Sequence, residues 1–377
     1  MKPHCVTALL VLLLAGCRDS TSPDSDGFWK DVSASANQAC GLARTGEVYC
    51  WGEGYGLVPR TPVSGLTATA LVENQCARNA AGEVHCWGGS IGTTPVQLAA
   101  AEARSFSRGY AVTCVVGADG VARCAGDNTH GELGNGTSGG RRESMAPVSG
   151  GYRFASVVAK GWTICGIDTG GAAACWGWNY MATLGRRTAE ACPPGPFSDP
   201  CATTPGPVSG GLSFRAIDVG GGHACGIATD GRLYCWGSAS FDVLGTGAAP
   251  DRCTANDSPC TYTPVPAGTR TDFRSIHTSG VFSCGLTADA EAYCWGSNYY
   301  GQLGDGVSNA SGTGPSRREA GLVSGGHRFT RIALGDDHGC GVTRQGKIFC
   351  WGKNEAGQLG VGQKPNSNRP VEVLRPS

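Results

Sequence analysis

Residues 221–237 read GGHACGIATDGRLYCWG, and this stretch decides the fold. Its two cysteines, Cys225 and Cys235, are ten positions apart, and Gly231 follows the first cysteine by six positions. Six other cysteine pairs have the same spacing, so the stretch is one copy of an internal repeat. The seven pairs are Cys40 with Cys50, Cys76 with Cys86, Cys114 with Cys124, Cys165 with Cys175, Cys225 with Cys235, Cys284 with Cys294, and Cys340 with Cys350.

Each copy has the features of a β-hairpin. The glycine at the sixth position is present in six copies, and Ala290 replaces it in the other. A three-residue loop that ends in a left-handed glycine forms a bulged hairpin. In that register the two cysteines face each other at about 4.5–5.5 Å, within disulfide reach. A two-residue loop would place them on opposite faces, so the glycine position and the spacing both favour the bulged form.

Further positions recur on both sides of the hairpin. An aromatic residue followed three positions later by Val or Ile precedes it, as in Phe214 and Ile217, and predicts another strand. Later copies continue as Asn-x-x-Gly-x-Leu-Gly, and a Pro-Val strand start ends most copies. Each copy therefore holds about four short strands. Trp-Gly follows the second cysteine at Trp51, Trp87, Trp176, Trp236, Trp295 and Trp351, with Ala125 in the third copy instead.

Four short strands repeated about every fifty residues predict an all-β, seven-bladed β-propeller, which we assign to residues 28–377. Glycine supplies 61 of the 377 residues, which argues against long helices. The segment Pro370–Val373 ends the chain and the segment Trp29–Val32 begins the fold. We therefore expect the C-terminal strand to pair with the N-terminal strand and close the ring. The first two copies are short, with spacings of 36 and 38 residues, and lack the Leu-Gly segment. The sequence therefore does not predict whether these two blades have complete outer strands.

The repeats resemble those of the regulator of chromosome condensation family, best from Gly221 to Gly237 and from Gly335 to Gly360. The resemblance covers residues 28–377 and implies a seven-bladed propeller. Cytoplasmic and nuclear members lack the systematic cysteine pairs, which suit an exported protein. The founder of the family is an exchange factor for a nuclear GTPase, and secreted bacterial members include a β-lactamase-inhibiting protein. The resemblance alone therefore leaves the function open.

The first seventeen residues have the features of an export signal. Lys2 is followed by an apolar run, Val6–Ala15, that is too short to span a bilayer. Leu14-Ala15-Gly16-Cys17 resembles a bacterial lipoprotein signal, so we predict that residues 1–16 are removed and that Cys17 is lipidated. An ordinary secretory signal with a chance cysteine is the alternative. Residues 17–27 suit a flexible tether. Both interpretations place the propeller outside the cytoplasm, where paired cysteines form disulfides, and the lipoprotein interpretation, which we adopt, places it in the cell envelope.

Composition and motifs argue against an enzyme and against a nucleic-acid binder. Thirty basic and thirty acidic residues cancel, so the chain has no basic footprint for nucleic acid. HExxH, GxSxG and Walker motifs are absent from the sequence. A cysteine spacing of ten without clustered histidines does not match metal ligands, so we expect no metal and no cofactor. His223 and His338 share one repeat position and are interpreted as structural hydrogen-bonding groups.

Departures from the repeat indicate a binding surface. Copies four and five carry inserted loops with their own cysteine pairs, Cys192 with Cys201 and Cys253 with Cys260, and we predict a disulfide in each. A stapled loop loses less freedom on binding. Aromatic side chains, which are frequent in binding hot spots, follow Trp-Gly in copies four to six. These residues are Trp178, Tyr180, Phe241, Tyr299 and Tyr300.

We therefore predict a monomeric, non-catalytic propeller that binds a protein partner through blades four to six and meets the membrane only through its lipid. Aromatic side chains that merely fill the grooves between blades are the structural alternative. A carbohydrate or cell-wall binder is the second functional hypothesis, in which the rings and the nearby Asn179 and Asn298 would hold sugars. A guanine-nucleotide exchange factor is the third, and export argues against it. The sequence does not predict which protein is bound.

Overall fold

The cysteine hairpin forms neighbouring strands of every blade. The structure is a computed structural model that describes residues 27–376, apart from 62, 74, 89–91, 93, 101, 111, 193–198, 248, 254–256 and 308–313. The paired cysteines lie directly opposite each other, as Cys225 and Cys235 do between β18 (His223–Ala228) and β19 (Leu233–Ser238). The turn glycines have positive φ angles of 68° to 100°, and Ala290 adopts the same conformation at 65°. The bulged register expected from the spacing is confirmed.

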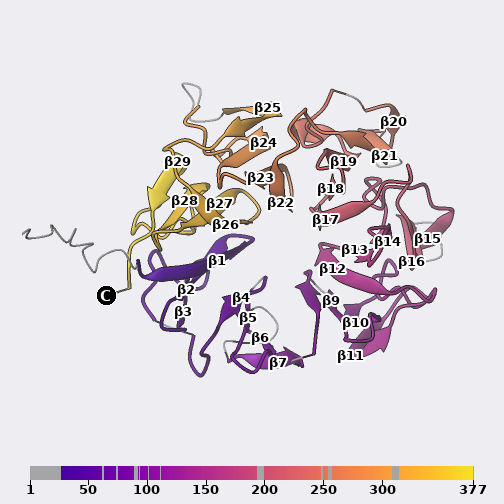
Figure 1. The fold of residues 1–377 in the computed structure, drawn as a ribbon, viewed down its shortest axis with the longest axis horizontal. Coiled ribbons are helices and arrows are strands. Elements are labelled where there is room, and N and C mark those ends of the chain that lie inside the picture. The colour runs from indigo at the N-terminus through magenta and orange to yellow at the C-terminus, as the bar shows by residue number, and fades with distance from the viewer. Residues whose placement is uncertain are drawn as a thin grey trace, which may run out of the picture.

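The strands of the described residues form seven antiparallel sheets arranged around a central axis, one sheet for each blade (Figure 1). Blades 1 to 3 consist of β1 (Trp29–Ser35), β2 (Gln38–Ala43) and β3 (Val48–Gly52); β4 (Ala70–Leu71), β5 (Cys76–Arg78), β6 (Val84–Cys86) and β7 (Val96–Ala99); and β8 (Ser105–Arg108), β9 (Val112–Val116), β10 (Ala122–Asp127) and β11 (Arg141–Pro147). Blades 4 and 5 consist of β12 (Phe154–Lys160), β13 (Thr163–Asp168), β14 (Ala173–Trp178), β15 (Glu190–Cys192) and β16 (Asp199–Pro207); and β17 (Phe214–Val219), β18, β19, β20 (Asp251–Arg252) and β21 (Pro259–Pro266). Blades 6 and 7 consist of β22 (Phe273–Thr278), β23 (Phe282–Thr287), β24 (Ala292–Asn298) and β25 (Gly314–Leu322); and β26 (Phe329–Leu334), β27 (His338–Thr343), β28 (Ile348–Gly352) and β29 (Ser367–Glu372).

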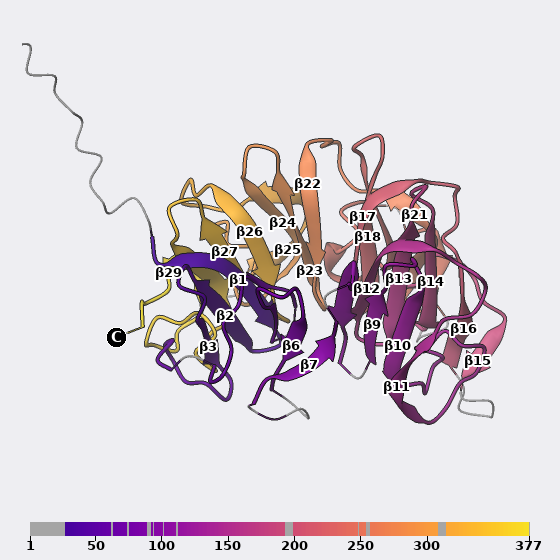
Figure 2. The same cartoon turned by 60° about the horizontal axis from the view of Figure 1, so that its bottom comes forward.

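The all-β, seven-bladed propeller predicted from the repeat is thus confirmed, and the sheets of successive blades stand side by side around the ring (Figure 2). A short 3-10 helix, Ser240–Asp242, lies between β19 and β20 in blade 5. Among the described residues, blade 1 has three strands and blade 2 has four short ones. No helix among the described residues has the length and hydropathy needed to cross a lipid bilayer. Residues 1–26, with the expected signal, Cys17 and most of the tether, lie outside the described part.

The expected pairing of the two terminal strands is wrong. β29 pairs with β28 inside blade 7, and β1 pairs with β2 inside blade 1. The ring closes instead through contacts between complete blades. The Trp29 amide donates to the Gly346 carbonyl at 3.0 Å, and Trp29, Val32 and Trp51 share one apolar cluster with residues of blade 7. Each repeat begins with the innermost strand of a blade and ends with the outermost strand. β1 therefore begins blade 1, and β29 completes blade 7.

Disulfides join all nine cysteine pairs predicted from the sequence, and each bridge restricts the unfolded chain, which stabilises the fold. Two of them, Cys192–Cys201 and Cys253–Cys260, close the inserted loops of blades 4 and 5. The other seven bridge the hairpins, with Cα atoms 4.0 to 4.2 Å apart. From blade 1 to blade 7 these are Cys40–Cys50, Cys76–Cys86, Cys114–Cys124, Cys165–Cys175, Cys225–Cys235, Cys284–Cys294 and Cys340–Cys350.

The repeated tryptophan connects blades 1, 4, 5, 6 and 7 to the blade before each of them. Its indole N–H donates to a backbone carbonyl in the Leu-Gly segment of the preceding blade at 2.8 to 2.9 Å. The glycine of that segment has no room for a side chain, since a Cβ on Gly185 would lie 2.9 Å from the Trp236 indole nitrogen. These bonds are Trp51 to Gln358, Trp176 to Glu132, Trp236 to Thr183, Trp295 to Val243, and Trp351 to Gln302.

The hydrogen bond from the tryptophan to the preceding blade also explains why copies two and three depart from the repeat. Copies one and two lack the Leu-Gly segment, so the following blades have no such carbonyl to meet. In blade 2 the Trp87 indole nitrogen is buried and has no carbonyl partner. In blade 3 the tryptophan position is Ala125. The tryptophan therefore depends on its neighbour along the ring as much as on its own hairpin.

Candidate protein-interaction face

One edge of the ring combines two kinds of loop, and we call it the loop face. It contains the turns between the first and second strands of each blade and the segments that follow Trp-Gly. Backbone hydrogen bonds hold the two kinds together within a blade, since the Trp178 amide donates to the Trp162 carbonyl and the Ser238 amide donates to the Gly222 carbonyl. The hairpin turns with the left-handed glycines lie at the opposite edge, because antiparallel strands alternate in direction.

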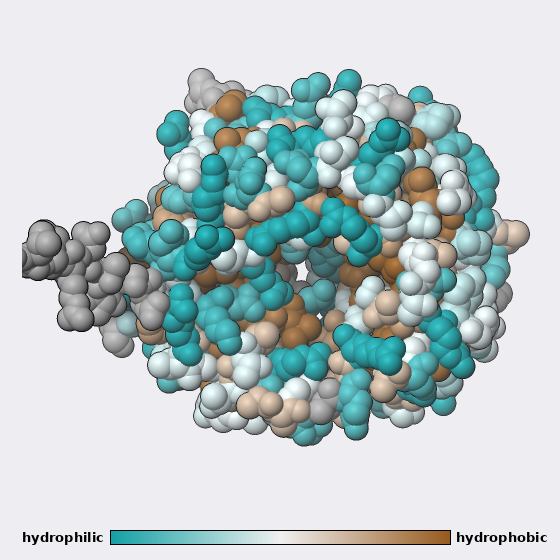
Figure 3. Space-filling view, viewed as in Figure 1, coloured by the Kyte–Doolittle hydropathy of each residue, from teal (hydrophilic) through white to brown (hydrophobic). Residues whose placement is uncertain are grey.

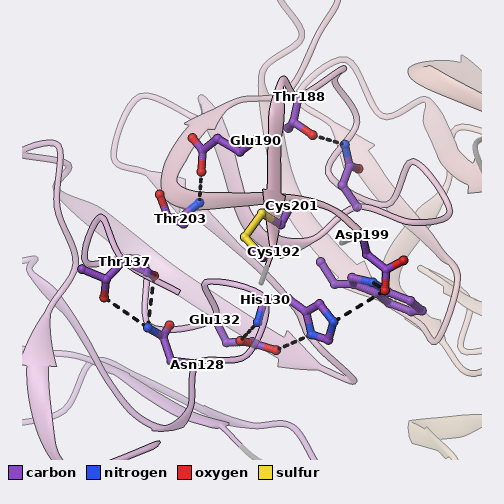
Figure 4. The surroundings of a disulfide bond; sticks show 12 residues. Asn128, His130, Glu132, Thr137, Thr188, Glu190, Cys192, Asp199, Cys201 and Thr203 are labelled. Atoms are coloured by element: carbon purple, nitrogen blue, oxygen red, sulfur yellow. Dashed lines mark hydrogen bonds and ion pairs between the residues drawn. A yellow bond between two sulfur atoms is a disulfide. The ribbon is translucent and has the colours of Figure 1, made fainter. Parts of the chain in front are cut away.

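Residues that flank the disulfide-closed loops of blades 4 and 5 pack against each other on this face, and we call this region the stapled platform. Arg187 of blade 4 forms an ion pair with Asp251 of blade 5 at 2.7 Å, and its guanidinium lies 4.2 Å from the centre of the Tyr262 ring. Tyr180 and Met181 of blade 4 pack on the buried Cys253, Cys260 and Tyr262. These contacts hold the described residues beside the two loops together across the boundary between the blades. The surroundings of the other staple, Cys192–Cys201, are shown in Figure 4.

The five aromatic residues predicted to bind a partner all lie on the loop face, but in three separate groups. Trp178 and Tyr180 stack at 5.1 Å and are half-buried. Phe241 is 57% exposed within the 3-10 helix. Tyr299 is 57% exposed, whereas Tyr300 beside it is half-buried. No ring contact between described residues joins these groups, so the expected continuous patch over blades 4 to 6 is divided.

Two exposed aromatic residues on the same face were missed by the sequence reasoning. Tyr110 is 65% exposed and Trp162 is 41% exposed, and they lie in the first turns of blades 3 and 4. Both directly follow a glycine, Gly109 or Gly161, in copies that are neighbours, and that shared position was the available signal. Their rings are 6.4 Å apart.

These residues extend the Trp178–Tyr180 stack into a continuous surface, which we call the aromatic track. Its members are Tyr110, Trp162, His130, Trp178 and Tyr180. Successive ring centres lie 5.1 to 6.5 Å apart, with Trp162 against Trp178 at 5.3 Å and His130 against Trp178 at 5.6 Å. The track crosses from blade 3 to blade 4 and ends on the stapled platform.

Carboxylates adjoin both ends of the aromatic track. At one end the Tyr110 hydroxyl donates to Asp336 of blade 7 at 3.2 Å. Although the side chain as a whole is 65% exposed, partial desolvation of its hydroxyl at the hollow and this carboxylate raise the pKa of Tyr110 to about 12. Burial also raises the pKa of Asp336. At the other end the Trp178 indole donates to Asp199 at 3.2 Å.

The His130 imidazole lies between two carboxylates, those of Asp199 and Glu132. Its imidazole lies 3.7 Å from the Asp199 carboxylate and 3.2 Å from the Glu132 carboxylate, as the side chains in Figure 4 show. Glu132 is buried, whereas the Asp199 side chain is 36% exposed. Asp199 is therefore the carboxylate at this end that a partner can reach.

The two asparagines considered for sugar binding are structural instead. Asn179 and Asn298 are buried, and each side-chain oxygen accepts the backbone amide of the leucine five positions later. Their amide groups donate to backbone carbonyls of the same loop. The hydrogen bonds of both side chains are thus used inside the protein, and the carbohydrate hypothesis loses the polar groups on which it depended.

The two repeated histidines are buried as well. His223 lies 2.7 Å from the Ser283 hydroxyl of the next blade, and burial lowers its pKa to about 4. Burial likewise lowers the pKa of His338 to about 4. Both imidazoles are therefore neutral at physiological pH, and neither reaches the loop face. The contact of His223 agrees with a structural role.

A hollow of about 630 Å³ runs along the axis of the ring, and its opening is visible in Figure 3. Its wall carries two ion pairs that each connect three blades. Lys160 of blade 4 pairs with Asp218 of blade 5 at 2.6 Å and donates to the Thr278 carbonyl of blade 6. Arg331 of blade 7 pairs with Asp31 of blade 1 at 3.0 Å and donates to backbone carbonyls of Leu71 and Val72 beside blade 2. These charges therefore hold blades together.

Burial shifts the pKa of two further ionisable groups in the wall of the hollow towards their uncharged forms. Burial raises the pKa of the Glu73 carboxyl, which accepts a hydrogen bond from Ser107 at 2.6 Å. Burial lowers the pKa of His277 to about 4. Among the described residues, no group of three or more His, Cys, Asp or Glu side chains could hold a metal ion.

Seven radial sheets with a loop-rich, aromatic face define the class of this protein as a seven-bladed β-propeller with a surface suited to binding. The family comparison identifies the repeat. The models of the regulator of chromosome condensation (RCC1) repeat match residues 29–55, 214–241, 276–302, 329–358 and 345–377. The chain therefore contains RCC1 repeats, as its motifs indicated.

Curated relatives share part of their length with this chain. The ultraviolet-B receptor UVR8 of Arabidopsis thaliana is 25% identical over 264 residues, which cover 68% of this chain and 54% of the receptor. The mitochondrial RCC1 domain-containing protein RUG3 of Arabidopsis thaliana is 32% identical over 163 residues, or 42% of this chain and 35% of RUG3. The human E3 ubiquitin-protein ligase HERC2 is 31% identical over 163 residues, which are 42% of this chain and only 3% of the ligase. This chain thus spans about half of UVR8 and smaller parts of the other two.

Solved structures show the same fold. Yeast RCC1 (Prp20), in its complex with Kap60, superposes with a TM-score of 0.63 at 18% identity, covering 91% of this chain and 74% of that chain. Human WBSCR16 superposes with a TM-score of 0.63 at 16% identity, covering 93% of this chain and 83% of that chain. At these identities the likeness shows the fold alone.

Proposed function

We propose that this chain is a non-catalytic, lipid-anchored protein of the cell envelope that binds a protein partner through its loop face. The observation that carries the proposal is the stapled platform, in which described residues that flank two disulfide-closed loops of neighbouring blades are held together by an ion pair and a buried cluster. An ordered surface loses less conformational entropy on association than free loops would. Protein binding by propellers with these repeats is supported by the solved complex of Prp20 with Kap60 and by the binding of Prp20p to Gsp1p and histones.

Aromatic side chains beside the platform supply the contact area of the proposed interface. Phe241 and Tyr299 are each 57% exposed, and no ring contact among the described residues ties either of them to the stapled platform. Aromatic residues at such positions supply much of the binding energy of interfaces. The stacked Trp178 and Tyr180 instead support the platform, because Tyr180 packs on the second staple. We therefore expect truncation of the exposed rings to reduce binding without unfolding the protein.

The test is capture of a partner from envelope extract by the oxidised propeller, residues 18–377, and by single variants of each exposed aromatic group. Trp162→Ala, Phe241→Ala or Tyr299→Ala is expected to weaken retention of one saturable partner about tenfold where the ring lies in the interface, since hot-spot truncations exceed about 1 kcal/mol. Retention would be measured by quantitative mass spectrometry after crosslinking. Thermal unfolding of each variant verifies the fold.

Leu322→Ala is the matched control for this experiment. Leu322 is 45% exposed and pairs with Tyr293 near the hairpin turns, at the edge away from the loop face. Its truncation removes similar apolar area and is expected to leave capture unchanged. If all three loop-face variants retain the partner as well as the parent chain does, binding through the loop face is refuted.

The proposed anchor has an independent test. A chain expressed with its first 27 residues is expected to incorporate labelled palmitate and to sediment with membranes, because Leu14-Ala15-Gly16-Cys17 matches a lipoprotein signal. Cys17→Ala is expected to abolish labelling. Cys5→Ala, which removes the other unpaired cysteine of the N-terminal segment, serves as the control and should leave labelling intact. Unlabelled protein, or a Cys17→Ala variant that stays on the membrane, would refute the anchor but not the binding face.

A further inference from the structure

The aromatic track differs from two other aromatic sites on the loop face because, among the described residues, no arginine or lysine lies over its rings. At two of those other sites, a ring, a cation and a carboxylate occur together. Arg187 lies over the Tyr262 ring at 4.2 Å and pairs with Asp251 at 2.7 Å. Lys353 lies over the Tyr300 ring at 4.7 Å and is 3.6 Å from the Glu355 carboxylate. In both, the ring face and the carboxylate together hold the positive charge.

The track has the ring and the carboxylate of such a triad twice, without an arginine or lysine over the ring. Trp178 donates its indole N–H to Asp199, and Tyr110 donates its hydroxyl to Asp336. None of the cation–ring contacts among the described residues involves a ring of the track. Asp199 shares its carboxylate with the His130 imidazole at 3.7 Å, and no Arg or Lys of the described residues pairs directly with Asp199 or Asp336. Lys353 pairs with the neighbouring Asp337 at 3.9 Å and acts on Asp336 only from a greater distance.

Exposure and placement make both incomplete triads reachable from solvent. Trp162, between the two carboxylate ends, is 41% exposed, and Tyr110 is 65% exposed at the mouth of the central hollow. The ring centres of Tyr110, Trp162 and Trp178 follow one another at 6.4 and 5.3 Å. Because an extended chain rises about 3.3 Å per residue, a segment lying along these rings reaches both carboxylates with basic residues roughly three to five positions apart.

We propose that the aromatic track binds a basic segment of the protein partner, in which an arginine or lysine side chain lies on the Trp162 and Trp178 rings and pairs with Asp199, while a second basic side chain pairs with Asp336. This inference rests on the proposed function, since it specifies the chemistry of the partner at the same face. Arginine suits the site better than lysine, because its planar guanidinium stacks on aromatic rings and binds carboxylates with two hydrogen bonds. Opposite charge at both ends also sets the register of the segment.

The test uses defined peptides rather than the unidentified partner. A fluorescent Gly-Ser decapeptide with two arginines four positions apart is titrated with oxidised residues 18–377 at pH 8, and fluorescence anisotropy reports binding. Matched peptides carry glutamine or glutamate in place of both arginines. We expect the arginine peptide to bind at least tenfold more tightly than either, and added salt to weaken it because the pairs are partly exposed.

Protein variants assign the binding to the track. Asp199→Asn and Asp336→Asn remove charge but keep an oxygen that can accept the Trp178 and Tyr110 hydrogen bonds. Each is expected to weaken the arginine peptide threefold to tenfold, and Trp162→Ala about tenfold. Asp289→Asn removes the same charge from an exposed hairpin turn at the opposite edge and is expected to change nothing. Equal binding of the glutamine peptide, or an equal loss with Asp289→Asn, overturns the proposal.

The two proposals fail in different ways. If a captured envelope partner is lost with Trp162→Ala but is retained by the Asp199→Asn and Asp336→Asn double variant, the protein-binding face stands and the basic segment is refuted. If capture is unaffected by every loop-face variant, the proposed function itself is refuted. Thermal unfolding of each variant distinguishes loss of contact from loss of fold, and Asn at either position is expected to leave unfolding unchanged within a few degrees.

Discussion

Trp236→Ala is expected to lower the free energy of unfolding by about 3–5 kcal/mol, as for other fully buried large aromatic residues. The Trp236 side chain has no exposed surface, and its indole donates to the Thr183 carbonyl of the preceding blade at 2.8 Å. Alanine removes this bond and leaves a cavity between blades 4 and 5, where the ring packs 5.7 Å from Phe214. The measurement is equilibrium unfolding in guanidinium under oxidising conditions.

Two phenylalanine variants separate the hydrogen bond from the packing. Trp236→Phe keeps an aromatic ring but leaves the Thr183 carbonyl unpaired, which should cost about 1–3 kcal/mol. Trp87→Phe is the matched control, because the buried Trp87 indole has no carbonyl partner in the first place. It should therefore cost clearly less. Equal losses for the two variants would show that the bond between blades contributes nothing and that only ring volume matters.

The second large effect is expected at the ion pair in the wall of the central hollow. Asp218→Asn should destabilise the protein by about 3 kcal/mol, because removing one partner leaves a largely buried charge uncompensated. Lys160 lies 2.6 Å from Asp218, and the two side chains are 27% and 10% exposed. Asparagine can still accept the Thr278 amide that Asp218 accepts at 2.7 Å, so the change isolates the charge. Thermal and chemical unfolding measure the loss.

A double variant and an exposed pair complete this experiment. Lys160→Met with Asp218→Asn is expected to recover most of the stability, since a buried pair replaced as a whole costs little. Asp119→Asn breaks the Arg123–Asp119 pair, whose side chains are 39% and 49% exposed, and should have little effect because solvent screens exposed pairs. A double variant no more stable than Asp218→Asn alone would contradict the assigned role of Lys160.

Within one blade, the sequence was a reliable guide because the contacts are local. The spacing of ten and the glycine at the sixth position decide the register of Cys225 against Cys235, since a short turn leaves few alternatives. The disulfides of the hairpins follow from that register. The hairpin of copy six has the same register, although Ala290 replaces the turn glycine. Its strands pair as in the other copies, and Ala290 adopts a φ of 65°.

The same sequence could not predict how blades meet. The predicted pairing of the two terminal strands was wrong, because a repeat shows which strands recur but not which strand begins a blade. The bond from Trp236 to Thr183 spans 53 residues, and the ion pair from Arg331 to Asp31 spans 300. The phase of the repeat and the curvature of the ring decide such contacts, and neither is encoded in a local pattern.

The candidate site likewise combines features that the sequence predicted with features that only the tertiary structure decided. Sequence alone located the stapled loops, the face on which Trp178, Tyr180, Phe241, Tyr299 and Tyr300 lie, and the nine cysteine pairs, because each depends on position within a single repeat. Only the tertiary structure decided that Tyr110 and Trp162 join Trp178 in one track, and that Asp336 of blade 7 reaches Tyr110 of blade 3 across the mouth of the hollow. The physical reason is that hairpin geometry depends on about a dozen adjacent residues, whereas a surface shared by several blades depends on the angle at which those blades pack.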